Sequence, residues 1–189
     1  MNRVLRSMTA LLFALALAAG AWAAPAYGPY AFKAIALTVP SRGASVPAVL
    51  TLPDKAGALP LVVMAHGHGG SKEENGGFTA IAEALAARGV ASVRMDFPGC
   101  GASTEAFTAN TVTNMLADME AARAAHAARA PIVAAITGVF GYSMGGRLAI
   151  LSAAKGYRSM GLLAPVGTDG PDAMFAFMGG KDSYAGYSA

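Results

Sequence analysis

The feature that most restricts the fold of this chain is an alternation of short apolar runs with segments of helical spacing. Apolar runs at 59–65, 90–95 and 132–142 each end at a glycine-rich loop, and a helical segment follows each loop. Two β-like runs at 33–39 and 46–53 precede them and predict an antiparallel hairpin. The alternation predicts parallel βαβ units and therefore an α/β fold, a mostly parallel sheet with helices on both faces.

Three segments have the spacing expected of the covering helices. A glycine ends the first and the third of them, and Asn110 or Thr111 is placed to cap the start of the second. The helical segments are 78–89, 111–129 and 144–156, and a last β-like run follows at 159–167.

The glycine-rich loops 66–70, 98–101 and 141–146 all follow the carboxyl ends of predicted strands. In open α/β sheets, ligands bind beyond those ends. The three loops are therefore predicted to converge on one edge of the sheet and to form the site there.

The loop at 141–145 has the pattern Gly-x-Ser-x-Gly between a β-rich run and a helix-forming run. A sharp strand-to-helix turn exposes the central Ser143 as a nucleophile, and Gly141 and Gly145 fit because side chains there would collide with the turn. The backbone amide of Met144 opens the following helix and is a candidate oxyanion donor.

The loop at 66–70 reads His-Gly-His-Gly-Gly, and the amide of His68 is predicted to be the second oxyanion donor. A phosphate loop is excluded, because the sequence lacks Gly-x-x-x-x-Gly-Lys-Ser/Thr. Two alternatives stay open: His66 and His68 could hold a metal with a third ligand, although their spacing is poor, or His66 could act as a catalytic base.

The motifs at 66–71, 96–103 and 141–146, in this order, resemble those of the α/β-hydrolase superfamily. The nearest groups are the dienelactone-hydrolase-like, cinnamoyl-esterase-like and serine-aminopeptidase-like members. The resemblance covers about 32–165 and does not specify a substrate. The dienelactone hydrolases proper differ, since they use cysteine where this chain has Ser143.

The resemblance implies that Ser143 is the nucleophile and that the backbone amides of Met144 and His68 form the oxyanion hole. It also implies a loop that shapes the site without reacting. The residues that match this loop are Asp96, Gly99, Gly101 and Ser103.

The match breaks at the rest of the catalytic triad. The superfamily places its acid and then its histidine after the serine, whereas His66, His68 and His126 all precede Ser143. His126 lies in a predicted helix and is expected to be a solvent-side or boundary residue. The sequence therefore predicts the N-terminal two-thirds of a hydrolase domain, without the C-terminal strands and with the triad acid and histidine beyond residue 189.

The aspartates after Ser143 are poor candidates for the acid. Asp182 follows Gly-Gly-Lys but lacks a preceding β-run, so it is expected in a connecting or cap segment. Asp169 and Asp172 lie in a turn-like sequence where solvated aspartates are common.

The N-terminus has the pattern of a secretory signal peptide: basic residues, an apolar stretch, and Ala21-Trp22-Ala23 before a cleavage site. We expect cleavage of residues 1–23, export to the periplasm or medium, and a single mature domain at 24–189. An uncleaved membrane anchor is the alternative. No cysteine lies at the end of the apolar stretch, so a lipid anchor has no attachment point there.

Composition excludes several other classes of function. The chain is 54% hydrophobic and 13% charged, which excludes a disordered protein. Its net charge of +3 falls to +1 without residues 1–23, which gives no argument for nucleic-acid binding. The single cysteine, Cys100, allows no internal disulfide and is interpreted as a small loop residue.

The predicted function is hydrolysis of a small-molecule ester, or an amide, through an acyl-enzyme at Ser143, without cofactor or metal and without a stable membrane span. Esters are favoured over peptides because nothing in the sequence suggests a propeller or another peptide-gating domain. The chain by itself is expected to be inactive or nearly so. The alternatives are a catalytically inactive binding module and a metal-dependent enzyme built on His66 and His68.

Overall fold

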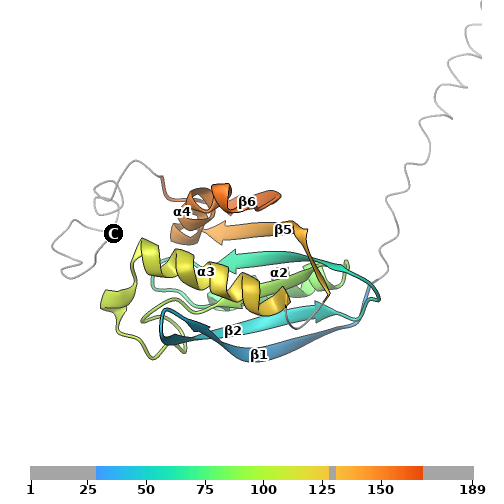
Figure 1. Ribbon diagram of the computed structural model, residues 1–189, viewed down its shortest axis with the longest axis horizontal. Helices are drawn as coiled ribbons and strands as arrows, with labels where there is room; N and C mark the ends of the chain where they lie inside the picture. The colour runs from blue at the N-terminus through green and yellow to red at the C-terminus, as the bar shows by residue number, and fades with distance from the viewer. Residues whose placement is uncertain (1–28, 128–130, 168–189) are drawn as a thin grey trace, which may run out of the picture.

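The computed structural model describes residues 29–127 and 131–167, which form one mixed sheet covered by helices (Figure 1). In this part of the chain the sheet has six strands in the order β1-β2-β4-β3-β5-β6. The elements are β1 Phe32–Ser41, β2 Ala44–Pro53, β3 Leu59–Ala65, η1 Glu74–Gly76, α2 Gly77–Ala86, β4 Ala91–Met95, η2 Phe107–Ala109, α3 Val112–Ala127, β5 Ile132–Tyr142, α4 Met144–Leu151, η3 Ala153–Lys155 and β6 Ser159–Leu163.

The predicted α/β architecture is confirmed. β1 and β2 form the antiparallel hairpin, and β2 also pairs antiparallel with β4. β4, β3, β5 and β6 are parallel to one another, as the strand–helix alternation predicts. The carboxyl ends of these four strands therefore lie at one edge of the sheet.

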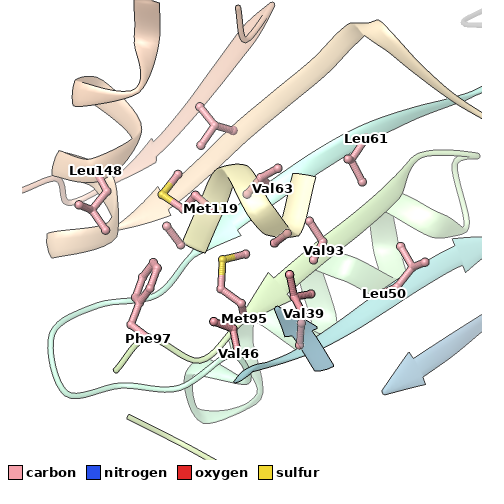
Figure 2. Packing of buried hydrophobic residues seen from close by; sticks show 14 of the residues in the cluster. Val39, Val46, Leu50, Leu61, Val63, Val93, Met95, Phe97, Met119 and Leu148 are labelled. Carbon is pink, nitrogen blue, oxygen red and sulfur yellow. The ribbon is translucent and has the colours of Figure 1, made fainter. Parts of the chain in front are cut away.

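The two faces of the sheet bury alternate residues of each strand. Leu61 and Val63 of β3 belong to the larger apolar cluster, which includes Met119 of α3 and Leu148 of α4 (Figure 2). Met64, by contrast, packs in a smaller cluster with residues of α2. This period of two places α3 and α4 on one face and α2 on the other.

The start of α3 is capped by one of the two predicted residues. Thr111 Oγ1 accepts a hydrogen bond from the backbone N–H of Asn114 at 3.2 Å, which is the usual geometry of a helix N-cap. Asn110 is instead buried, and its side-chain amide donates to the backbone oxygen of Pro98 at 2.8 Å. The cap is therefore Thr111, and Asn110 fixes the loop that precedes the helix.

The prediction that His126 lies at the solvent side or boundary of its helix is wrong. The side chain is fully buried, and Nδ1–H donates to the backbone oxygen of Ala122. His126 follows buried Met119 by seven residues and Met115 by eleven, so all lie on the stripe of α3 that faces the sheet. The segment is rich in alanine all around its axis, which hid this stripe in the sequence.

The far edge of the described sheet is apolar and open. The exposed fractions are 37% for Met160, 42% for Leu162 and 51% for Leu163, all in β6. On the α2 face, a groove of about 220 Å³ separates α2 from β6, and Ile81 and Met160 are among its lining residues. Among the described residues, β6 thus forms an exposed apolar edge of the sheet.

Several predictions fall on other parts of the chain. The signal peptide at 1–23 and the three aspartates Asp169, Asp172 and Asp182 lie outside the described residues. Between residues 29 and 167, leaving out 128–130, no helix is long and apolar enough to cross a membrane.

Candidate active site

Ser143 lies in a strained turn between β5 and α4. Its backbone angles are φ 52° and ψ −115°, which side-chain-bearing residues rarely adopt. A Cβ at Gly141 would lie 2.1 Å from the backbone oxygen of Gly145, and a Cβ at Gly145 would lie 1.9 Å from that of Ala65. Neither position has room for a side chain, so the two glycines allow the turn to form against the end of β3.

The backbone of Ser143 is tied to the chain that follows β6. Its N–H donates to the backbone oxygen of Leu163 at 3.0 Å. Its carbonyl oxygen accepts from Gly146 N–H at 3.0 Å, within the first turn of α4, and from Val166 N–H at 3.1 Å. The strained turn is therefore held from two sides, by α4 and by the segment 163–166.

The loop after β3 lies directly beside the serine. A Cβ placed on Gly67 would lie 3.5 Å from the Cβ of Ser143 and 3.0 Å from the ring of Tyr142. Met144 is the first residue of α4, and backbone N–H groups at a helix N-terminus point outward along the axis. The structure thus brings Ser143, Met144 and the loop that carries His68 together at one edge of the sheet.

His66 is buried and uses both ring nitrogens on backbone groups. Nδ1–H donates to the oxygen of Gly67 at 2.7 Å, and Nε2 accepts from Phe97 N–H at 3.1 Å. These partners fix the neutral tautomer with its proton on Nδ1. Burial lowers the pKa of His66, against smaller opposing effects from the bond to Gly67 and from Asp96. The ring joins the loops after β3 and β4, and this arrangement leaves neither nitrogen for a metal or for a proton from Ser143.

His68 lies edge-on against Phe107, with ring centroids 5.3 Å apart. Burial lowers the pKa of its ring, and neighbouring His66 lowers it further. Across the described segments, no group of three or more histidine, cysteine, aspartate or glutamate side chains could hold a metal ion.

Asp96 organises the two loops that flank the site. Its buried carboxylate accepts hydrogen bonds from the backbone N–H of Lys72 and from Lys72 Nζ, both at 2.7 Å, and from Ala102 N–H at 2.9 Å. A Cβ on Gly101 would overlap this carboxylate, at 2.2 Å from Oδ1. Asp96 and Gly101 therefore shape the loop after β4, and Lys72 connects it with the loop after β3.

Three other residues of the loop after β4 have local roles. Ser103 Oγ accepts a hydrogen bond from Glu105 N–H at 3.3 Å. Cys100 is buried, and burial raises the pKa of its thiol. A smaller fraction of the side chain is therefore in the reactive thiolate form. At Gly99 a Cβ would lie 2.4 Å from the Cα of Phe107, so only glycine fits at this position.

Lys72 and Glu74 also reach the site, although neither belongs to the predicted motifs. Glu74 Oε2 accepts a hydrogen bond from the backbone N–H of Gly67 at 2.8 Å. The signal in the sequence is the charged run Lys72-Glu73-Glu74, which follows the glycines at 69–70 after a single serine. Charged residues at that place are usually solvated, and only the folded loop shows which of them turn inward.

Comparison with known families gives one match over most of the described chain. The profile of the family described as "Serine aminopeptidase, S33" matches residues 57–173. A search of curated proteins finds no significant match.

Solved structures with similar folds include several α/β hydrolases. Est1E from Butyrivibrio proteoclasticus, solved with ferulic acid bound, is 25% identical with a TM-score of 0.61, over 75% of this chain and 55% of that one. A cold-adapted esterase from an Arctic intertidal metagenomic library is 24% identical, with a TM-score of 0.59 over 69% of this chain and 60% of that one. XC6422 from Xanthomonas campestris, described as a serine hydrolase without a lid, is 21% identical, with a TM-score of 0.60 over 73% of this chain and 64% of that one.

The chain thus spans between 55% and 64% of the length of these three structures. The two with less than 25% identity support the fold alone. The family match and these structures together confirm the resemblance to α/β hydrolases.

Proposed function

The chain belongs to the serine aminopeptidase family S33, and from this premise we propose that it carries the nucleophile of an exported serine hydrolase that cleaves small carboxylic esters. Membership supports a hydrolase of the esterase or peptidase kind. The use of Ser143, the preference for esters and the export are parts of the proposal.

The observation that carries the proposal is the strained backbone of Ser143. A non-glycine residue at φ 52° and ψ −115° is costly, by about 1–3 kcal/mol, and persists only where its surroundings enforce it. Here Gly141 and Gly145 provide the space, and Leu163 and Val166 supply hydrogen bonds that hold the turn. Such a turn presents a serine hydroxyl at the edge of the sheet where substrates bind.

In the proposed mechanism, Ser143 Oγ attacks the ester carbonyl carbon while a base takes its proton. Negative charge moves onto the carbonyl oxygen, and the backbone amides of Met144 and His68 stabilise it. The alcohol leaves with a proton, an acyl-enzyme remains, and water releases the carboxylic acid by the reverse sequence of steps.

We place the base and its acid partner beyond residue 189. His66 is bonded on both nitrogens, and buried His126 donates from Nδ1 to its own helix. His68 packs edge-on against Phe107. The match covers only 55% to 64% of these three structures, and the uncovered part of each leaves room for the further strands, the acid and the histidine. This chain alone is then inactive or nearly so.

The preference for esters has two supports. No sequence feature suggests a domain that would select peptides, and Est1E is described as binding ferulic acid, a carboxylic acid. A carboxylic acid is the acyl product of ester hydrolysis.

Export is proposed from the signal-peptide pattern of residues 1–23. N-terminal sequencing of the protein recovered from the periplasm or medium is expected to begin at Ala24. A protein that still begins at Met1 would contradict cleavage.

The experiment that tests the function begins with the DNA beyond codon 189, which is expected to encode an aspartate after a further strand and then a histidine. The full-length protein should react stoichiometrically with a fluorophosphonate probe and hydrolyse p-nitrophenyl esters. Ser143→Ala should abolish both, with Ser152→Ala, a buried serine at the C-terminal end of α4, as control. Stoichiometric labelling of the 189-residue chain itself would contradict the proposed need for a distant histidine.

The second candidate is a binding module without catalysis. It would be favoured by a stop codon directly after codon 189 together with ester binding but no turnover. The intact Gly-x-Ser-x-Gly turn argues against it, since a site without chemistry has no need of a strained residue.

A further inference from the structure

The loop that carries His68 is held by a carboxylate from outside the predicted motif. The backbone N–H of Gly67 donates to Glu74 Oε2 at 2.8 Å, a bond to a charged acceptor and therefore stronger than a bond between neutral groups. The loop at 67–70 has room for this carboxylate because residue 70 is glycine. A Cβ there would lie 2.9 Å from Oε2 and 3.1 Å from Oε1 of Glu74.

Glu74 reaches this position through an unusual backbone. Glu74, Asn75 and Gly76 have φ values of 43°, 52° and 89°, so three consecutive residues lie in the left-handed region. Two of the three carry side chains, for which this conformation is unfavourable. A strained conformation persists when other contacts enforce it, and the bond from Glu74 to Gly67 is such a contact.

The same peptide segment is held on its other side. The carbonyl oxygen of Gly67 accepts from His66 Nδ1–H at 2.7 Å and from Gly70 N–H at 3.1 Å. In a planar trans peptide, the N–H of the next residue points opposite to this carbonyl. The three bonds to Gly67 therefore fix the direction of the His68 N–H. The loop lies beside Ser143, since a Cβ on Gly67 would be 3.5 Å from the Cβ of Ser143.

From this geometry we propose that Glu74 is a positioning residue for hydrolysis: by holding Gly67 N–H, its carboxylate orients the His68 backbone amide as oxyanion donor. The inference rests on the proposed function, because it needs an oxyanion at Ser143. Glu74 touches no reacting atom and acts through the peptide between Gly67 and His68.

The test uses the full-length enzyme that the gene encodes, with four variants: Glu74→Ala, Glu74→Gln, Glu73→Ala and Ser143→Ala. Glu73 is the matched control, since it is the adjacent glutamate and pairs with Lys72 at 3.4 Å on the surface. Active enzyme is counted by fluorophosphonate titration, so that loss of folded protein does not count as loss of rate.

We expect Glu74→Ala to lower kcat about 10- to 100-fold with KM almost unchanged, because the donor acts mainly in the transition state. Glu74→Gln keeps an acceptor oxygen and should recover most of the rate. Glu73→Ala should match the wild type. In a protein labelled with ¹⁵N-glycine, the Gly67 amide resonance should move upfield in Glu74→Ala and stay in place in Glu73→Ala.

The outcomes separate the two proposals. If Ser143→Ala abolishes turnover but Glu74→Ala keeps the wild-type kcat, the positioning role is wrong and the proposed function stands. The positioning role is also wrong if the chemical shift of the Gly67 amide does not change in Glu74→Ala. It is wrong as well if Glu74→Ala lowers the melting temperature without lowering kcat. If Ser143→Ala remains active, the proposed function fails and the positioning role fails with it.

Discussion

Strands β4 and β6 have the same length but opposite environments. All five residues of β4 are buried, although the strand contains Ser92 and Arg94. None of the five residues of β6 is buried, although Met160, Leu162 and Leu163 are strongly apolar. Burial therefore does not follow from the composition of a strand. It follows from what packs around it.

The neighbours of the two strands explain the difference. β4 pairs with β2 on one side and β3 on the other, and α2 and α3 cover its two faces. β6 pairs with β5, and α4 packs against it. The burial of β4 also affects its charged residue, Arg94. Burial lowers the pKa of its guanidinium, whose Nη1 lies 3.4 Å from Thr51 Oγ1.

The largest difference between β4 and β6 is expected in the free energy of unfolding when the same substitution, methionine to alanine, is made in each strand. Met95→Ala in β4 removes a fully buried side chain and should lower the free energy of unfolding by about 2–5 kcal/mol. Met160→Ala in β6 removes a side chain that is already partly in water and should cost less than about 1 kcal/mol. Urea denaturation measures both. Equal losses would mean that β6 is covered in solution.

A second prediction concerns the serine turn, which lies between the end of β3 and the segment 163–166. Gly145→Ala places a methyl group against the backbone oxygen of Ala65 and should cost about 1–3 kcal/mol or more. Gly77→Ala is the control, since nothing lies within 4 Å of its Cβ and its φ is −61° in α2. That variant should be neutral or more stable by up to about 1 kcal/mol. The contrast disappears if the turn relaxes around alanine.

A third prediction concerns the pH dependence of the free energy of unfolding, to which the buried His66 contributes. Its pKa is lowered by burial in the folded state, so the unfolded chain takes up this proton at a higher pH than the folded chain. The stabilising contribution is fully present above about pH 6.5, the ordinary pKa of histidine, and is lost as the pH falls below it. Urea denaturation from pH 7.5 to 5 should show this loss, and His66→Asn should show a smaller one. Parallel curves for the two proteins would rule out His66 as the source.

The smallest effect on folding, but a clear one on solubility, is expected at the open edge. Leu162→Lys should change the free energy of unfolding by no more than about 0.5 kcal/mol, because the side chain is exposed. A charge on an exposed strand opposes edge-to-edge pairing, so self-association in sedimentation velocity should decrease. Ala36→Lys on exposed β1, the opposite edge, is the control and should not reduce association. Equal reductions would indicate a general effect of charge.

Much of the fold was predictable because it depends on local periodicity. The alternation of short apolar runs with segments of helical spacing, and the glycines at strand ends, were sufficient for the α/β class. The Gly-x-Ser-x-Gly pattern was sufficient to locate the turn at Ser143, since only glycine fits at Gly141 and Gly145.

The rest depends on contacts between distant residues. Asp96 meets Lys72 across 24 positions, and Glu74 meets Gly67 only once the chain turns back through strained residues. His126 could have been placed from the stripe it shares with Met119, but alanine on every side of α3 obscured that stripe. Periodicity reports which residues share a face, and it does not report which loops meet.

The hydrogen bonds between Ser143 and the segment 163–166 also define where this fold can be divided. A break before Leu163 would remove both tethers of the serine turn, whereas a break after Val166 leaves them intact. The serine turn is therefore a composite module that needs β5, α4, β6 and the three residues that follow β6, 164–166. A two-fragment reporter made from such a hydrolase should be split just after Val166, so that one fragment holds the preformed serine turn and the other supplies the remaining catalytic groups.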